Sequence, residues 1–385
     1  MTPFDFHCPT RIVFGPGRAA ELGGLTAGLG VGRALVVSDP GIEEVGHTQR
    51  GVESLRAAGI ETLLFDGVQE NPTTDNVDAG VAVARNFRPD AVVAIGGGSS
   101  MDCAKGINFV YSCGGRMQDY WGVGKATAEL LPMVAVPTTA GTGSEAQSFA
   151  LISDAETHAK MACGDKRAAF RIAILDPELT LTQPPQVTAL TGIDAVSHTI
   201  ETLVSTKRNQ VSMAFSREAW RLLSQGLPRV LAEPGDLAAR GWVQQGACFA
   251  GLAIENSMLG AAHALANPLT AAYGIVHGQA VGMMLPHVVD HNADRSPGTR
   301  RAYEELTDEL VIPDHADPNV ARHELDRFLA ELLIEAGLAS TLGELGVDKQ
   351  KLPELAANAA TQWTGTFNPV EMTADDYLRL YENAF

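Results

Sequence analysis

The chain has 385 residues, 45% of them hydrophobic, which is enough for two domains with substantial cores. Its formal net charge of −18 argues against nucleic acid or an anionic membrane as a partner. No apolar run approaches the roughly 20 residues that a membrane-spanning helix needs, and the opening residues lack a basic start and an apolar signal core. Five scattered cysteines form no close ligand spacing. We therefore expect a soluble protein with reduced thiols, in the cytoplasm by default.

The first half of the chain alternates short β-branched runs with amphipathic stretches, as a parallel sheet covered by helices requires. The expected strands are 34–39, 61–68, 91–97, 133–139 and 171–177. The segments 43–59 and 74–87 are expected to form crossover helices. After Pro184 and Pro185, helical periodicity dominates and strand signals nearly vanish. The sequence thus predicts an α/β dinucleotide-binding domain at 1–183 and an all-helical metal-binding domain at 184–385.

Three glycines, Gly96, Gly97 and Gly98, stand where the strand at 91–97 meets the next helix. Without Cβ atoms they let backbone amides approach a pyrophosphate, and Ser99 and Ser100 add donors at the helix N-terminus. A tight turn without a ligand explains the glycines alone equally well.

Two further polar positions follow predicted strands. The loop at 137–146 either lines a cofactor or is an ordinary turn before a helix; it offers the hydroxyls of Thr138, Thr139, Thr142 and Ser144. Asp39 ends the strand at 34–39, where a carboxylate binds the adenosine ribose and repels a 2′-phosphate, which favours NAD over NADP. The alternative for Asp39 is a helix N-cap.

The helical half contains one Asp and three His in an order that indicates a mononuclear metal site. Asp194 and His198 lie four residues apart, so a helix presents both on one face. His263 and His277 follow in GAAHALANPLTAAYGIVHG. One carboxylate and three neutral imidazoles suit Fe(II) or Zn(II), with a position left open for a substrate oxygen.

Several motifs in order resemble the iron-containing (group III) alcohol dehydrogenases: GGGSSMDCAK, PTTAGTGSEA, TGIDAVSHTIE and the stretch from GAAHALANPL to VVDHN. The resemblance runs nearly from end to end and implies the fold shared with dehydroquinate synthase. It also implies that Asp194, His198, His263 and His277 are the metal ligands. It places Gly97, Gly98, Ser99 and Asp102 in the dinucleotide loop, and Thr138, Thr139 and Thr142 along the nicotinamide and pyrophosphate. Lys160 and Asn71 match further cofactor positions.

Asn267 departs from the family pattern, because relatives commonly carry a second His one turn after the third ligand. An amide does not titrate near neutral pH. Asn267 is therefore a candidate catalytic residue that orients the substrate, and any proton relay needs water, the cofactor ribose or another route.

The resulting hypothesis is reversible hydride transfer between a primary alcohol or aldehyde and NAD(H), assisted by Fe(II) or Zn(II). The alternatives are a reductase of a functionalised aldehyde or keto acid, of the phosphonoaldehyde or maleylacetate type, and a metal-dependent lyase like dehydroquinate synthase. A non-catalytic metal- or nucleotide-binding protein is a further reading. We expect a small-molecule substrate and a homo-oligomer, a dimer or larger, in which the exposed strand at RIVFG pairs across subunits.

Overall fold

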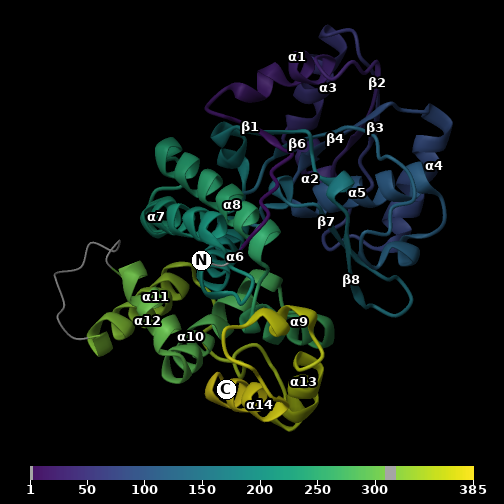
Figure 1. Ribbon diagram of the computed structural model, residues 1–385. Coiled ribbons are helices and arrows are strands. Elements are labelled where there is room, and N and C mark those ends of the chain that lie inside the picture. Colours follow the sequence, from purple (N-terminus) through teal and green to yellow (C-terminus); the bar gives the residue numbers. More distant parts are fainter. Residues whose placement is uncertain (1–2, 308–317) are drawn as a thin grey trace. The chain divides into compact units, whose positions relative to one another are not determined.

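The computed structural model describes residues 3–307 and 318–385, and the chain divides into two compact units (Figure 1). One unit is Cys8–Gln183, and the other is Pro184–Phe385 together with the residues up to His7. The sequence assigned those first residues to the α/β unit. Phe6 instead stacks on Phe215 of the helical unit, with ring centroids 6.0 Å apart.

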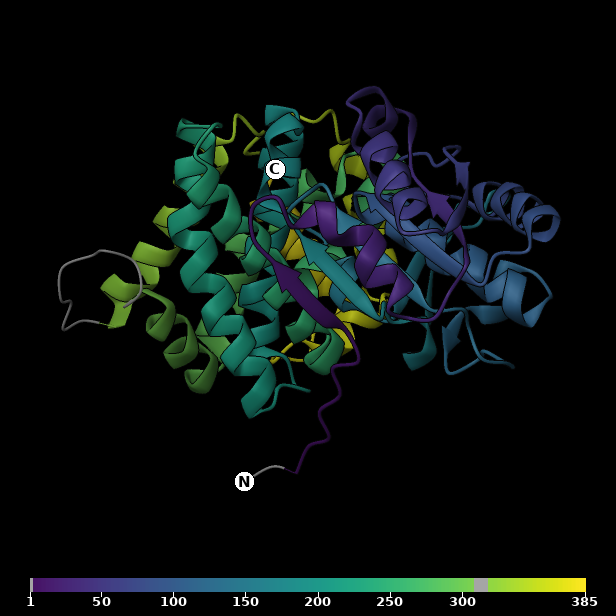
Figure 2. The same cartoon turned by 90° about the horizontal axis from the view of Figure 1, so that it is seen from above.

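A six-stranded parallel sheet forms the centre of the α/β unit, in the order β1-β9-β6-β4-β2-β3. Figure 2 shows β1, in dark purple, at one edge of this sheet. The five expected strands are all present, and each ends before its predicted limit. The six strands are β1 (Arg11–Phe14), β2 (Arg33–Val37), β3 (Glu61–Phe65), β4 (Ala91–Gly96), β6 (Met133–Pro137) and β9 (Ile172–Leu175).

Helices cover both faces of this sheet, as the alternating pattern predicts. α1 (Leu22–Ala27) and α3 (His47–Ala57) pack on one face, and α4 (Thr74–Phe87) and α5 (Gly98–Cys113) on the other. The short helix α2 (Pro40–Glu44) follows β2. α4 has the predicted bounds: the Asn76 side chain accepts a hydrogen bond from the Thr73 N–H at its start, and Arg88, in a left-handed conformation, follows its end.

A second, three-stranded sheet in the order β5-β8-β7 was not expected from the sequence. β5 (Gly122–Val123) has only two residues, and β7 (Phe149–Ser153) and β8 (Lys160–Gly164) contain a single β-branched residue between them, Ile152. Such short strands, with few β-branched residues, give almost no pattern signal. The loop at 137–146 ends in a 3-10 turn at Ser144–Ala146. The next element is the strand β7 and not the helix that the sequence interpretation offered as an alternative.

The other unit contains helices and no strand within the residues that the structure describes, as the sequence predicts. Among these residues, no helix is both long and apolar enough to cross a membrane. Its α-helices are α6 (Pro185–Val204), α7 (Gln210–Ala232), α8 (Leu237–Ser257), α9 (Ala261–Tyr273), α10 (His277–Arg295), α11 (Pro297–Thr307), α12 (Pro318–Glu335), α13 (Leu352–Ala359) and α14 (Ala374–Asn383).

Candidate active site

Helix α6 carries the centre of the Asp–His cluster. Nearly every residue of this helix from Thr188 to Val204 is buried, because α7, α8 and α10 pack around it. A helix enclosed on all sides removes its polar side chains from water. Asp194 and His198 therefore project from one face of α6 into the interior of this unit, at 6% and 4% exposure.

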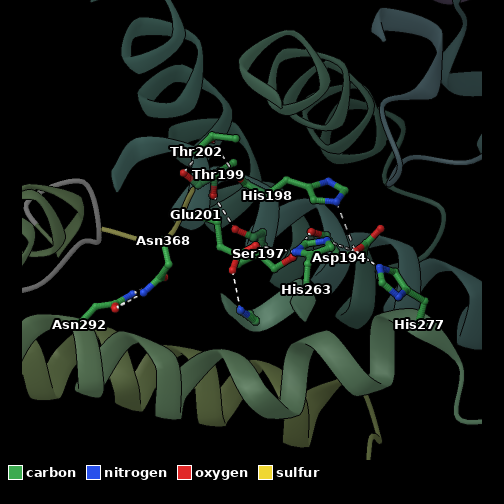
Figure 3. Close-up of polar contacts among 12 residues, drawn as sticks. Asp194, Ser197, His198, Thr199, Glu201, Thr202, His263, His277, Asn292 and Asn368 are labelled. Carbon is green, nitrogen blue, oxygen red and sulfur yellow. Dashed lines mark hydrogen bonds and ion pairs between the residues drawn. The ribbon is translucent and has the colours of Figure 1, made fainter. Parts of the chain in front are cut away.

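Three imidazoles surround one carboxylate oxygen in this interior (Figure 3). The Nε2 atoms of His198, His263 and His277 lie 3.4, 3.6 and 3.8 Å from Asp194 Oδ1. His263 belongs to the first turn of α9, and His277 is the first residue of α10. All four residues that the sequence singled out thus lie close together in the structure, although they come from three different helices.

These distances fit a shared cation better than direct hydrogen bonds. A charge-assisted N–H···O contact is about 2.7–2.9 Å long. Ligand atoms bound to one tetrahedral ion at 2.0–2.1 Å are about 3.4 Å apart. Asp194 Oδ1 and His263 Nε2 are buried and have no hydrogen-bond partner among the described residues. One ligand atom each from Asp194, His263 and His277 lies within 4.8 Å of the others, as in a group that could hold a metal ion.

Electrostatics favour a positive charge at this position. Burial raises the pKa of Asp194, but His198, His263 and His277 outweigh burial and hold that pKa below its ordinary range. Burial lowers the pKa of His263, but Glu201 and Asp194 raise it to about 9. The cluster therefore attracts a cation, either protons or a metal ion.

Glu201 is a member of this cluster that the sequence interpretation missed. Its Oε2 lies 2.5 Å from His263 Nδ1, and its Oε1 accepts a hydrogen bond of 2.7 Å from the Ala262 N–H. The spacing Asp194, His198, Glu201 is i, i+4, i+7, which places all three on one helix face. This spacing is the feature of the sequence from which Glu201 could have been predicted as part of the site.

Asn267 lies one turn after His263 on α9, and its Nδ2 donates a hydrogen bond of 3.0 Å to Gln362 Oε1. Two amides thus pair at this position. Neither side chain titrates, so the hydrogen bond holds the two amides in a fixed orientation, and the pair does not exchange protons.

In the α/β unit, the glycine turn and the loop at 137–146 lie against each other. A Cβ on Gly97 would lie 3.2 Å from Thr139 Cγ2, and a Cβ on Gly98 would lie 2.6 Å from Thr142 Cγ2. Only glycine allows this approach at Gly98. The buried Thr138 Oγ1 has no hydrogen-bond partner among the described residues. The two polar segments therefore form one surface of amides and hydroxyls.

The remaining cofactor candidates gather around this surface. The Asn71 N–H, in a left-handed conformation with φ 53°, donates to Ser99 Oγ at 3.2 Å. Asp39 caps α2 through the Ile42 N–H and accepts a hydrogen bond from Ser100 Oγ at 2.9 Å. The N-cap alternative for Asp39 is thus realised, and its contact with Ser100 places it beside the glycine turn.

Asp102 uses both carboxylate oxygens within the protein. Oδ1 accepts from Ser144 Oγ at 2.5 Å, and Oδ2 accepts from the Leu151 N–H at 3.2 Å. Burial raises the pKa of Asp102, while Lys105 and, more weakly, Lys160 lower it. Asp102 therefore ties α5 to the loop at 137–146 and to β7, and Lys160 is close enough to act on it electrostatically.

We expect Gly98→Ala to weaken NADH binding about five- to a hundredfold, because overpacking of this kind costs about 1–3 kcal/mol. The added Cβ would displace Thr142 from the glycine turn. Fluorescence titration with NADH measures the change. Gly24→Ala is the matched control, since a Cβ there meets nothing within 4 Å. Equal affinity of both variants would contradict a cofactor role for this turn.

A parallel α/β unit with a glycine-rich turn is typical of nucleotide-binding domains, and the buried Asp–His cluster of the helical unit has the ligand types of a metal site. The family model "Iron-containing alcohol dehydrogenase" matches residues 9–177, and the model "Fe-containing alcohol dehydrogenase family, C-terminal" matches residues 188–385. The chain belongs to the iron-containing alcohol dehydrogenase family. It is therefore an enzyme of the alcohol oxidoreductase class, and the predicted family and fold class are confirmed.

Relatives with different substrates are similar over nearly their whole length. Alcohol dehydrogenase 4 of Schizosaccharomyces pombe is 35% identical, over 98% of this chain and 88% of its own length. The NAD-dependent methanol dehydrogenase of Bacillus methanolicus is 34% identical, over 99% of each chain. The crystal structure of a 1,3-propanediol oxidoreductase has a TM-score of 0.96 and 32% identity, and covers 100% of both chains.

Proposed function

We propose that this protein catalyses reversible hydride transfer between a primary alcohol or aldehyde and NAD(H), with a divalent metal held by Asp194, His198, His263 and His277. The observation that carries the proposal is the convergence of three imidazole Nε2 atoms on Asp194 Oδ1 at 3.4–3.8 Å. A bound Fe(II) or Zn(II) would supply a positive charge that polarises the substrate C–O bond.

The protein's own residues contribute charge, orientation and exclusion of water. Asp194 and Glu201 together place two negative charges next to three imidazoles, which balances a divalent cation. Burial of Asp194, His198 and His263 keeps water out, so these charges act at low dielectric. His277, at 24% side-chain exposure, is the most accessible of the four and marks the side from which a substrate can enter.

We propose that the cofactor binds the surface formed by Gly97, Gly98, Ser99, Thr138, Thr139 and Thr142. The amides at the start of α5 suit a pyrophosphate, and the buried Thr138 hydroxyl remains available for a ligand. Asp39 beside this turn favours NAD, because its charge repels a 2′-phosphate. Asp102 holds the two segments together, with Asn71 and Lys160 at the margin of the site.

The proposed function is tested on chelator-stripped protein reconstituted without oxygen with Fe(II), Zn(II) or no metal. We expect NADH oxidation by short primary aldehydes to appear only in the metal-loaded samples. Functionalised aldehydes and keto acids belong in the same panel, because the substrates of the relatives differ. Equal rates with and without metal would exclude a role for the Asp–His cluster in the reaction.

Replacement of Asn267 by His tests the proton route. An imidazole donates to Gln362 as the amide does, so we expect a stable protein. It also titrates near pH 6.5, so the pH profile of kcat should acquire a step between about pH 6 and 7. Asn267→Ala is the control that removes the amide without adding a titratable group. An unchanged profile in Asn267→His would count against any proton relay at this position.

We also propose that the protein assembles into a homodimer through strand β1. β1 is an edge strand with one neighbour in the sheet, and Phe14 at its end is 36% exposed. Light scattering on Phe14→Glu measures the effect, and we expect a shift toward monomer. A monomeric unaltered protein would refute the assembly.

A further inference from the structure

Glu201 is the buried group next to the Asp–His cluster that the proposed mechanism uses only as a charge. It is 4% exposed and lies on α6, seven residues after Asp194. A carboxylate buried this deeply is costly unless its oxygens are hydrogen-bonded. Both are: Oε1 accepts from the Ala262 N–H at 2.7 Å, and Oε2 faces His263 Nδ1 at 2.5 Å (Figure 3).

The surroundings hold Glu201 in this position. A Cβ on Gly260 would lie 2.9 Å from Glu201 Oε1 and 3.3 Å from Asn368 Oδ1, so only glycine at the start of α9 allows the carboxylate to reach the Ala262 N–H. The carboxylate therefore caps the first turn of α9 and contacts the His263 ring at the same time.

The contact with Nδ1 decides which nitrogen of His263 faces the cluster. An ionised carboxylate only accepts hydrogen bonds, so Nδ1 carries the proton. A metal ligand must be a neutral imidazole, and in the neutral ring with its proton on Nδ1 the lone pair is on Nε2, 3.6 Å from Asp194 Oδ1. Nε2 has no hydrogen-bond partner among the described residues, so nothing in this part of the chain competes for that lone pair.

We propose that Glu201 is a positioning residue that fixes the Nδ1–H tautomer of His263 and so presents Nε2 as a metal ligand. The inference rests on the proposed function, because it assigns a role toward the same metal. A residue in this relation to a ligand imidazole typically changes metal affinity about 10–100-fold when it is replaced.

Glu201→Gln is the decisive variant, because it keeps the shape and removes the all-acceptor character. If the Gln oxygen accepts from the Ala262 N–H, the NH2 group faces Nδ1 and favours the proton on Nε2, the wrong tautomer for a ligand. If the amide is reversed, its NH2 group opposes the Ala262 N–H. Either orientation loses one of the two contacts that Glu201 makes.

The measurement is the Kd for Zn(II) and Co(II) on the metal-free full-length protein, by competition with a chromophoric chelator. We expect Glu201→Gln to bind both ions about 10–100-fold more weakly than the unaltered protein. Ser205→Ala is the matched control. It removes another buried hydrogen bond at the end of α6, from the Ser205 hydroxyl to the Ser257 carbonyl at 2.6 Å, and neither residue is a proposed metal ligand. Its affinity should be unchanged.

Glu201→Asp separates position from charge, and it also serves if Glu201→Gln does not fold. It keeps the negative charge but shortens the side chain by one methylene, so the contact with Nδ1 lengthens. We expect weaker binding and an altered visible spectrum of the Co(II) form. Affinity and spectrum equal to those of the unaltered protein would overturn the positioning role.

The inference is also overturned if Glu201→Gln binds as tightly as the unaltered protein, or if Ser205→Ala loses as much affinity as Glu201→Gln. If the unaltered protein binds neither ion, the proposed function is refuted, because the Asp–His cluster is then not a metal site. The proposed role of Glu201 is refuted as well. The Kd of the unaltered protein distinguishes these two cases.

Discussion

Replacement of Asp194 by Asn is expected to abolish retention of the metal and to reduce aldehyde reduction by about 10²–10⁴-fold. Asp194 Oδ1 is the atom on which the three imidazole nitrogens converge. Removing the anionic partner of a buried cation costs about 3–5 kcal/mol, and each 1.4 kcal/mol is a factor of ten. An amide of the same shape keeps the packing and removes only the charge.

Metal content after dialysis and the NADH-dependent rate measure this effect in the same preparation. Asp294→Asn is the matched control, because Asp294 is exposed and pairs with Arg300 at 3.7 Å, away from the cluster. We expect its metal content and rate to equal those of the unaltered protein. Full metal content in Asp194→Asn would show that the cluster is not the metal site.

The pairing of Asp194 and His198 on α6 could be predicted from the sequence because the two residues are neighbours on one helix. The i, i+4 spacing of Asp194 and His198 predicted a shared face, and the structure places the two side chains 3.4 Å apart. His263 and His277 were singled out as further imidazoles in the stretch GAAHALANPLTAAYGIVHG, and the family motifs implied the same ligand set. Glu201 was not predicted as part of the site. Its contact with the ligand His263 joins residues 62 positions apart in the sequence.

The α/β unit shows the same division between local and long-range information. The helix at 74–87 was predicted with its exact bounds, because Thr73 and Asn76 signal its start locally. The strand at 34–39 ends earlier, at Val37, because Asp39 caps α2 and Ser38 donates to the Ile95 carbonyl. The three-stranded sheet depends on pairings such as Leu151 with Ala162, which no periodicity reveals.

Replacement of Lys105 by Met is expected to destabilise the α/β unit strongly. Lys105 is fully buried, and its Nζ donates to the Ser144 carbonyl, the Ser144 hydroxyl and the Phe149 carbonyl at 2.7–2.8 Å. It also lies 3.6 Å from Asp102 Oδ1. Met has a similar length but no charge, so Asp102 is left as a buried anion, at a cost of about 3–5 kcal/mol.

We expect the thermal midpoint of this unit to fall by about 6–20 °C, since 1 kcal/mol corresponds to about 2–4 °C at this size. Differential scanning calorimetry measures the shift. Lys166→Met, which changes an exposed lysine of the same unit, is the control and should be neutral. The double variant Asp102→Asn with Lys105→Met should recover part of the loss, because it removes the anion as well.

The pH dependence identifies the uncompensated anion as the cause of that loss. Burial raises the pKa of Asp102 above 3.8, its ordinary value, and the loss of the Lys105 charge would raise it further. A carboxyl with a raised pKa in the folded state lowers stability where it is ionised, and this penalty disappears as the pH falls through the folded and then the ordinary pKa. The deficit of Lys105→Met should therefore be smaller at pH 5 than at pH 7.5. A deficit independent of pH would instead assign the whole loss to the three hydrogen bonds of the ammonium group.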